Sequence, residues 1–287
     1  VTVGWIHYLA FELFAGLWIA RDADAIMAQW APIDASVIAG LTQCKVIVRY
    51  GIGVDNVDLA AAKERDIPVC NVPDYGVHEV AEHAVSLGLA LARQLPMIDA
   101  RLRAGTWKIV PDRPMASLSA MTFATAGFGR IARAAHGMMS GFGGKRIAYD
   151  PFVPADVMEK AGVEKVQLED LFAQADILSL HLPLTDETQH LVNADRLSAM
   201  KPTAIVVNTA RGPLIDTVAL AAALEADEIA AAGVDVFEDE PLPDDHPLRS
   251  AKHALLTSHV AWYSEASIPR LQRLTAEEAV RGLKGEV

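Results

Sequence analysis

The amino-acid sequence predicts an α/β protein built on parallel sheets. Along most of its 287 residues, short apolar runs alternate with segments of helical composition, which is the pattern of repeated strand–helix–strand units. The composition is 52% hydrophobic but only 6% aromatic, as is typical of helices packed on a buried parallel sheet. A chain of this length can bury more than one core, so we expect two domains.

Charge and cysteine content restrict the expected partners and compartment. The formal net charge is -12, which disfavours nucleic acid and anionic membranes because both require a basic surface. Cys44 and Cys70 lie in or beside apolar runs, so we expect buried thiols in a reducing compartment, the cytoplasm. No disulfide framework or metal site is expected.

The first twenty residues, VTVGWIHYLAFELFAGLWIA, are nearly as long and apolar as a membrane span. His7 and Glu12 interrupt this run, and neither a basic region nor a small-residue cleavage signal accompanies it, which disfavours a signal peptide. We expect a core strand followed by a buried helix.

The remaining elements are predicted in two series. In the first, strands are expected within residues 22–30, 44–51 and 67–73, followed by a long helix over 78–102 that Pro96 interrupts. After a loop, six apolar runs separated by helix-length spacers predict a doubly wound sheet; they occupy residues 121–129, 145–150, 175–182, 203–210, 231–237 and 253–260. The chain ends in an amphipathic segment that predicts a final helix.

A glycine-rich string, GFGRIA at residues 127–132, follows the first strand of the second series and opens a helix. This context makes it a dinucleotide-binding fingerprint of the Rossmann type rather than an ordinary glycine turn. Gly127 permits a tight turn, and Gly129 lets the backbone approach a pyrophosphate. The amides of Arg130 and Ile131 are expected to meet the negative charge at the helix N-terminus.

Asp150 ends the next predicted strand, about twenty residues beyond the glycines, where a carboxylate can accept hydrogen bonds from the adenosine ribose. The adjacent sequence YDPFVP offers no basic residue for a 2′-phosphate, which Asp150 would repel. NAD is therefore the expected cofactor, in preference to NADP.

Three polar residues follow successive strands of the second series: Arg211, Glu240 and His259. Ligands of doubly wound sheets bind at the carboxyl ends of strands. Hydride transfer to a ketone requires a cation that holds the substrate carboxylate and a proton donor for the developing alkoxide, roles that Arg211 and His259 fit. Glu240 could stabilise the protonated imidazole. Singly, each has an ordinary explanation: a surface ion pair, a solvated acid and a buried histidine.

Together these residues resemble the D-isomer-specific 2-hydroxyacid dehydrogenase family, in the branch with phosphoglycerate dehydrogenases and C-terminal-binding-protein corepressors. The resemblance extends from about Asp22 and rests on VRYGIGVDNVDL, IPVCNVPDYGVHEVAEHA, GFGRIAR, LSLHLPLTDET, VNTARG, GVDVFEDEPLP and SHVAWYSEAS. It implies that Arg211 orients a 2-oxo acid, that His259 is the acid/base and that Glu240 is its partner. Hydride would then pass between NAD(H) and C2 of a D-2-hydroxy acid.

The resemblance implies further contacts. For the substrate these are Arg49, Ile52, Gly53 and Trp262, although Trp262 is equally well explained as a core or interface aromatic. For NAD they are His181, Leu182, Pro183, Thr209, Ala210 and Asp235. Two departures from the family pattern, Pro213 and Ser258, lead us to expect weakened but not abolished activity.

The family layout implies a flavodoxin-like substrate domain of residues 1–95 and 264–287, and a NAD-binding domain of residues 96–263, with hinges near Pro96 and Tyr263. The arm from Leu95 to Ser119 resembles a dimer-forming extension, so a homodimer is expected. The alternative is an NAD(H)-sensing interaction protein with little turnover. A formate dehydrogenase is disfavoured, since that branch usually pairs its histidine with glutamine and not with a residue such as Glu240.

Overall fold

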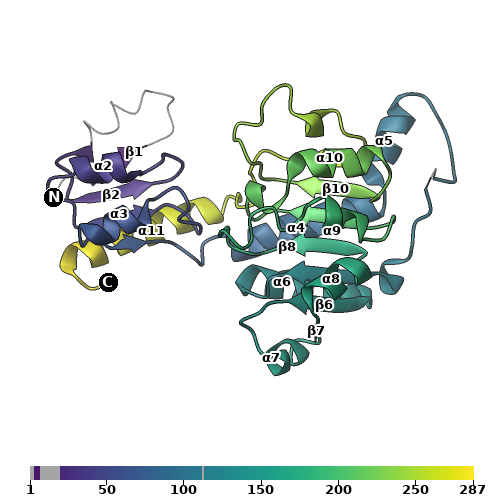
Figure 1. Cartoon of the computed structure of the whole chain (residues 1–287), viewed down its shortest axis with the longest axis horizontal. Coiled ribbons are helices and arrows are strands. Elements are labelled where there is room, and N and C mark those ends of the chain that lie inside the picture. Colours follow the sequence, from purple (N-terminus) through teal and green to yellow (C-terminus); the bar gives the residue numbers. More distant parts are fainter. Residues whose placement is uncertain (1–2, 7–19, 112) are drawn as a thin grey trace. The chain divides into compact units, whose positions relative to one another are not determined.

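The computed structural model describes residues 3–6, 20–111 and 113–287, which form two compact units (Figure 1). The smaller unit comprises Val1–Gly76 and Tyr263–Val287, and the larger comprises Val77–Trp262. The expected boundary near residue 95 differs from this division, because helix α4 (Val77–Ala92) contacts strands of the larger unit.

The smaller unit contains a parallel sheet whose strands β1 (Val3–Ile6), β2 (Ala25–Ala28), β3 (Val46–Arg49) and β4 (Val69–Cys70) lie in sequential order. Each strand after the first matches a predicted apolar run, and β1 matches the strand expected at the start of the chain. This parallel sheet agrees with the α/β substrate domain that the family layout implies. The buried helix expected after β1 lies outside the described residues.

Helices cover both faces of this sheet. Helices α2 (Ala35–Gly40) and α3 (Leu59–Glu64) pack on one face, around Ile26 and Ile47. The final helix, α11 (Ser267–Lys284), packs on the other face through Ala279. Asp34 and Asp58 cap α2 and α3 by accepting hydrogen bonds from backbone amides.

The larger unit contains a seven-stranded parallel sheet in the order β11-β10-β9-β8-β5-β6-β7. Its strands are β5 (Thr122–Ala126), β6 (Lys145–Tyr149), β7 (Glu164–Lys165), β8 (Ile177–Leu180), β9 (Ile205–Asn208), β10 (Ala231–Val234) and β11 (Ala254–Leu256). The order reverses between β5 and β8, which is the switch point where doubly wound sheets bind ligands. All six predicted strands are present, and the doubly wound Rossmann fold is confirmed.

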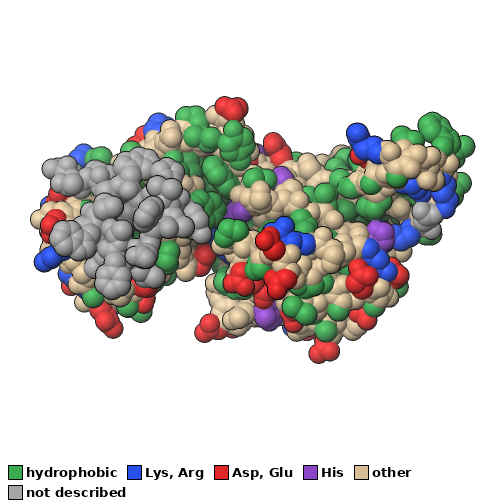
Figure 2. All heavy atoms as spheres, turned by 90° about the horizontal axis from the view of Figure 1, so that it is seen from above, with side chains coloured by type: hydrophobic (Ala, Val, Ile, Leu, Met, Phe, Trp, Pro, Cys, Tyr) green, Lys and Arg blue, Asp and Glu red, His purple; other side chains and the backbone are tan. Residues whose placement is uncertain are grey.

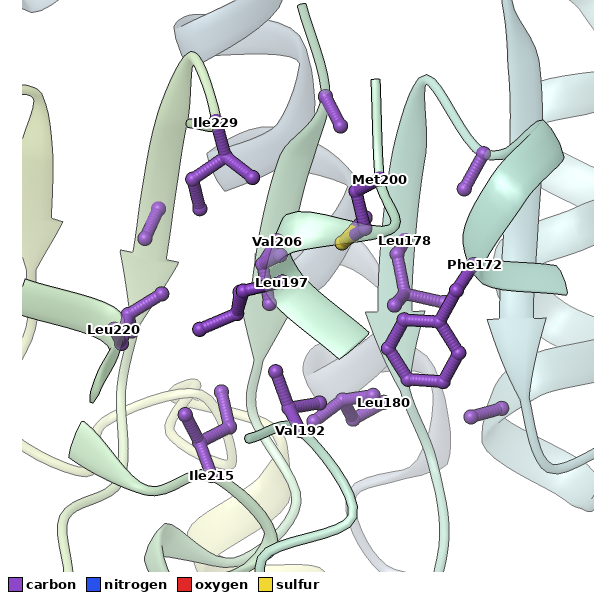
Figure 3. Close-up of a cluster of buried hydrophobic side chains, with 14 of the residues drawn as sticks. Phe172, Leu178, Leu180, Val192, Leu197, Met200, Val206, Ile215, Leu220 and Ile229 are labelled. Atoms are coloured by element: carbon purple, nitrogen blue, oxygen red, sulfur yellow. The ribbon is translucent and has the colours of Figure 1, made fainter. Parts of the chain in front are cut away.

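Two hydrophobic clusters fix the layers of the larger unit. On one face, α4 and α6 (Arg130–Met139) pack against side chains such as Phe123 and Ile205. On the other face, α8 (Leu168–Gln174), α9 (Ala194–Ser198) and α10 (Thr217–Glu225) enclose the larger cluster. Figure 3 shows Phe172, Leu178 and Leu197 of this cluster pointing into the space between sheet and helices. Buried apolar area of this kind is the main stabilising contribution to the fold.

The long helix predicted over residues 78–102 is two helices, α4 and α5 (Leu95–Arg103). The break lies at Gln94, which has a left-handed backbone conformation (φ 52°), and Pro96 lies in the first turn of α5. Proline suits a first turn because the amide that it lacks has no intrahelical acceptor there. Pro96 therefore begins the second helix instead of kinking the first.

Helix α5 has no buried residue, and the chain after it exposes large apolar side chains. Trp107 is 79% exposed and Ile109 is 87% exposed. Figure 2 shows hydrophobic and basic side chains gathered at the end of the larger unit that carries α5. We call residues 95–119 the arm.

The shorter elements are α7 (Ala155–Glu159) and the 3-10 turns η1 (Leu118–Ala120), η2 (Ser140–Phe142), η3 (Gly212–Leu214) and η4 (Pro247–Arg249). No helix within the described residues combines the length and the apolar character that crossing a membrane demands.

Candidate active site

The glycine fingerprint forms the turn between β5 and α6, at the switch point of the larger sheet. Gly127 has φ 94°, and a Cβ there would lie 2.4 Å from the carbonyl oxygen of His181. At Gly129, the N-cap of α6, a Cβ would meet nothing within 4 Å. The first turn of α6 thus presents its amides beside an open backbone surface, which fits a pyrophosphate.

Asp150, directly after β6, binds the same turn. Its Oδ2 accepts a hydrogen bond from Phe128 N at 2.9 Å, and its Oδ1 accepts from Phe152 N at 2.9 Å and Val153 N at 3.2 Å. The carboxylate therefore holds the glycine turn against the end of β6. Each carboxylate oxygen can accept more than one hydrogen bond, so this arrangement is compatible with an additional ribose contact.

The strand ends beside the turn hold the other residues predicted to contact the cofactor. His181 follows β8, and its amide donates to Ala126 O at 2.8 Å. Burial lowers the pKa of His181 to about 4, so its imidazole is neutral near pH 7. Leu182 is half-buried and Pro183 is exposed beyond it.

At the end of β9, Thr209 is buried, and its hydroxyl finds no hydrogen-bond partner within the described part of the chain. A buried hydroxyl in that state is costly unless a ligand satisfies it. The amide of the next residue, Ala210, donates to Asn208 Oδ1 at 3.0 Å. With the glycine turn and Asp150, these residues fit a bound dinucleotide.

His259 and Glu240 form a hydrogen-bonded pair, with His259 Nδ1 lying 2.7 Å from Glu240 Oε2. The other carboxylate oxygen of Glu240 accepts from Phe237 N at 2.9 Å. Both side chains are partly exposed, His259 at 24% and Glu240 at 32%. The pair can therefore exchange protons with a ligand while the carboxylate stays oriented by the backbone.

His259 has a positive φ of 53°, a strained backbone conformation for a residue with a side chain. Its amide donates to Asp235 O at 2.7 Å, and its carbonyl accepts from Trp262 Nε1 at 2.9 Å. Ser258, which precedes it, is exposed. The tryptophan predicted to line the substrate pocket thus contacts the turn that carries His259, while a contact with substrate remains a prediction.

Asp235 is fully buried and anchors this turn. Its Oδ1 accepts from Thr257 Oγ1 at 2.5 Å and Val260 N at 3.0 Å, and its Oδ2 accepts from Ala261 N at 3.0 Å. Donors within the chain surround the carboxylate. The structure therefore gives Asp235 a role in holding His259, while the expected contact with the nicotinamide remains a prediction.

Arg211 lies on the loop between β9 and α10. Asn208 fixes its backbone by donating from Nδ2 to Arg211 O at 2.8 Å, and Arg211 Nη1 donates to Ala210 O at 2.6 Å. Pro213 lies in the first turn of η3, where the fixed φ of proline is compatible with the backbone. The proline that departs from the family pattern is thus accommodated in a regular turn.

The other predicted substrate residues lie in the smaller unit, at the end of β3 and just after it. Arg49 is buried, with its guanidinium 5.5 Å from the ring centroid of Trp30. A Cβ on Gly51 would lie 2.0 Å from Arg49 Nη1, so glycine is needed for Arg49 to adopt this position. Asn71 Nδ2 donates to Ile52 O at 2.6 Å, and Ile52 and Gly53 are half-buried.

Sequence reasoning missed several residues that support the site. Asn208 orients the backbone of Arg211, and Thr257 donates to Asp235. His83, on α4, has its Nε2 3.0 Å from Thr257 Oγ1 and 3.6 Å from Asp235 Oδ1. Asn208 could have been noticed as a polar residue at the end of an apolar strand. His83 lies in the matched string IPVCNVPDYGVHEVAEHA, but the sequence assigned it no role.

Hydride transfer to a carbonyl requires a dinucleotide and a group that exchanges protons. The larger unit carries the glycine fingerprint and the His259–Glu240 pair after strands of one sheet, at its carboxyl edge. Fold and site together define a dinucleotide-dependent oxidoreductase. Residues 85–261 match the D-isomer specific 2-hydroxyacid dehydrogenase, NAD binding domain, and the chain belongs to this family. It is accordingly an NAD-dependent enzyme of the 2-hydroxyacid dehydrogenase class.

Similar proteins act on different small acids. The chain is 37% identical over 272 residues to the glyoxylate reductase of Korarchaeum cryptofilum, covering 93% of this chain and 82% of that protein. It is 38% identical over 266 residues to the D-3-phosphoglycerate dehydrogenase of Mycobacterium tuberculosis, of which it spans 50%. The D-lactate dehydrogenase of Aquifex aeolicus, solved with NAD and lactic acid, has a TM-score of 0.88 at 28% identity, over 94% of this chain and 86% of that chain.

Proposed function

We propose that this chain interconverts a small 2-oxo acid and the corresponding D-2-hydroxy acid, with His259 as the acid/base, Glu240 as its partner and Arg211 as the cation that binds the substrate carboxylate. The single observation that carries the proposal is the 2.7 Å pairing of His259 Nδ1 with Glu240 Oε2. An imidazole held in this way has a preferred orientation. A fixed orientation is needed for directional proton transfer.

The chemistry divides between cofactor and protein. Bound NAD(H) supplies or accepts the hydride. Because Glu240 engages Nδ1 of His259, Nε2 is the atom that gives a proton to the carbonyl oxygen in reduction and removes it in oxidation. The carboxylate balances the positive charge of the imidazolium. The guanidinium of Arg211 can bind a carboxylate through two parallel hydrogen bonds and thereby orient the adjacent carbonyl.

We also assign Arg49, Ile52, Gly53 and Trp262 to substrate binding, as the family resemblance implies. The packing of Arg49 against Gly51 and Trp30 supports a fixed cation on the smaller unit. The names of the relatives favour a small substrate such as glyoxylate, lactate or phosphoglycerate in its oxidised or reduced form.

The decisive experiment replaces His259. In His259→Ala the proton donor is absent, so turnover of a 2-oxo acid should fall by about two to four orders of magnitude. The dissociation constant of NADH, measured by fluorescence titration, should stay near that of the parent, because the glycine turn is untouched. A variant that keeps parental turnover would remove the assigned role.

A matched control is His253→Asn, at the other end of β11. His253 also has a positive φ, 61°, which asparagine tolerates. The side chain lies before the strand and not at its carboxyl end, so this variant should keep parental turnover.

We further propose that the protein works in the cytoplasm as a homodimer formed through the arm. The support is the exposure of apolar side chains along α5 and the chain after it, namely Leu95, Leu102, Trp107, Ile109 and Val110. Several large exposed apolar side chains in one segment favour an interface. Cys44 and Cys70 are free thiols, as suits a reducing compartment.

A further inference from the structure

Two segments that carry proposed catalytic side chains pass each other in direct contact: the loop of residues 211–216 and the segment of residues 237–240. A Cβ on Gly212 would lie 1.9 Å from Phe237 C and 2.4 Å from Glu238 N. Only glycine therefore lets the loop lie this close to the segment. Because Phe237 N also donates to Glu240 Oε1, the backbone that Gly212 touches is the same backbone that orients Glu240.

The side chain of Glu238 joins this segment to the end of the Arg211 loop. Its Oε2 accepts hydrogen bonds from the amide of Thr217, at 3.2 Å, and from the Thr217 hydroxyl. Thr217 is the first residue of α10 and is 1% exposed. A carboxylate at a helix N-terminus is favoured by the helix dipole as well as by these hydrogen bonds. Glu238 thus holds the point where the loop enters α10.

The other oxygen of Glu238 pairs with His190, whose backbone binds the middle of the same loop. His190 Nε2 lies 2.7 Å from Glu238 Oε1, and His190 N donates to Pro213 O at 2.8 Å. His190 has a positive φ of 49°, a conformation that costs energy and requires support from its surroundings. Glu238 therefore secures the loop in its middle, through His190 and Pro213, and at its end, through Thr217 at the start of α10.

The hydrogen-bond directions in this cluster are mutually consistent. Leu248 N donates to His246 Nδ1 at 3.2 Å, so the ring proton is on Nε2, which lies 3.1 Å from Thr217 Oγ1. Thr217 accepts from His246 and has its own proton left for Glu238. The network ends at the Glu238 carboxylate, which accepts hydrogen bonds from Thr217 and pairs with His190.

We propose that Glu238 is a positioning residue that sets the place of Arg211 relative to the His259–Glu240 pair, by holding the Arg211 loop against the segment that bears Glu240. The inference rests on the proposed roles of Arg211, Glu240 and His259. Glu238 acts on the substrate through Arg211 and through no contact of its own. Its loss should weaken binding of the 2-oxo acid and leave NADH binding unchanged, because the glycine turn lies after a different strand.

The test compares three variants. Glu238→Ala removes the acceptors for Thr217 and His190, and the KM of a 2-oxo acid should rise about tenfold or more, with a smaller loss in kcat. Glu238→Gln keeps an oxygen for Thr217, so its KM should lie near the parental value. Asp239→Ala changes the neighbouring exposed carboxylate and should behave like the parent. The NADH dissociation constant should not change in any of them.

A second readout does not depend on turnover. Oxamate, a 2-oxo acid analogue that cannot be reduced, is titrated into the NADH complex and its affinity is measured by fluorescence. Arg211→Ala and Glu238→Ala should both weaken oxamate, and in the double variant their effects should be clearly less than additive, because both act through the same guanidinium.

The outcomes separate the two claims. If Arg211→Ala weakens oxamate and Glu238→Ala does not, the positioning role is wrong and the proposed function stands. If Arg211→Ala has no effect on oxamate, the proposed role of Arg211 is wrong. A purely structural role of Glu238 would lower kcat and the thermal midpoint together at parental KM, and that result also overturns the inference. If Glu238→Ala does not fold, Thr217→Val is used in its place. This variant removes the hydroxyl that donates to Glu238, and the same outcomes decide between the claims.

Discussion

At the scale of single residues, the larger unit places its histidines in opposite electrostatic settings. His259 is partly exposed and paired with a carboxylate, which suits a proton donor. His136, on α6, is buried against Phe123 and Phe128, and burial chiefly lowers its pKa to about 3. Its Nε2 lies 2.9 Å from Thr125 Oγ1, which itself donates to Gly127 O. His136 is thus a neutral core residue behind the glycine turn.

This setting predicts an acid-sensitive fold. In the unfolded chain the pKa of a histidine is near 6.5. Between about pH 6.5 and pH 3, His136 therefore binds a proton in the unfolded state but not in the folded state. The stability that its neutral form contributes should be complete above about pH 6.5 and should fall as the pH drops toward about 3. His136→Leu removes this titrating group. As the pH falls, the free energy of unfolding of the variant should decrease less steeply than that of the parent, and the two slopes should differ by up to about 1.4 kcal/mol per pH unit. Urea denaturation from pH 7 to pH 4 measures the slope. Equal slopes for parent and variant would show that His136 titrates normally in the fold.

Side-chain pairings between distant residues were also the feature that the sequence predicted least well. The roles suggested for His259 and Glu240 rested on their positions after apolar strands, and the structure does bring the two side chains together. The pairing of Glu238 with His190, 48 residues away, has no local signature. Side-chain partners of this kind depend on how loops from different strands meet.

At the scale of elements, the turn from β5 to α6 offers backbone groups to the cofactor that we expect there. A motif of this kind is readable in sequence because glycine is required at fixed positions for steric reasons. The six predicted strands are present for a similar reason, since each contains a short apolar run. Strand β7 was missed because it has two residues, Glu164 and Lys165, and neither contributes to an apolar run.

Substitutions at the two glycines of this turn should affect stability and cofactor binding differently. A Cβ at Gly129 meets nothing within 4 Å, so Gly129→Ala should fold like the parent and still bind NADH at least about tenfold more weakly, because the methyl group occupies the pyrophosphate surface. Gly127→Ala should lose both properties, because the new Cβ would overlap His181 O at a positive φ.

The matched control is Gly137→Ala, within α6, where a Cβ also meets nothing within 4 Å. It should stabilise the protein by about 0.5–1 kcal/mol and leave NADH affinity unchanged. Thermal melts and NADH titrations measure both quantities for all three variants. Parental NADH affinity in Gly129→Ala would contradict the assigned cofactor site.

At the scale of the whole molecule, the chain combines two α/β units with an arm whose helix buries none of its own residues. The two-unit organisation could be predicted from length and strand rhythm. The division at Gly76 could not be predicted, because it depends on the packing of α4 against β9 and β10. The periodicity of a helix does not show which sheet the helix packs against.

The exposed arm predicts a dimer that its apolar side chains hold together. Replacing Trp107 and Ile109 by serine should convert the dimer to a monomer, because large aromatic and aliphatic side chains contribute most of the binding energy of an interface. Phe152→Ser is the control, since Phe152 is 92% exposed but lies outside the arm. Sedimentation velocity measures the mass. A parent that sediments as a monomer, or a double variant that stays dimeric, would exclude this interface.

Hydride transfer between NAD(H) and C2 of a small acid can be followed with an isotope label. The protein is incubated with a panel of 2-oxo acids and NADH deuterated at C4, and the products are analysed by mass spectrometry and chiral chromatography. We expect deuterium at C2 of a D-2-hydroxy acid for at least one substrate, and its loss in His259→Ala. If NADH binds normally but no member of the panel yields a labelled hydroxy acid, the proposed reaction is wrong and an NAD(H)-sensing protein is favoured.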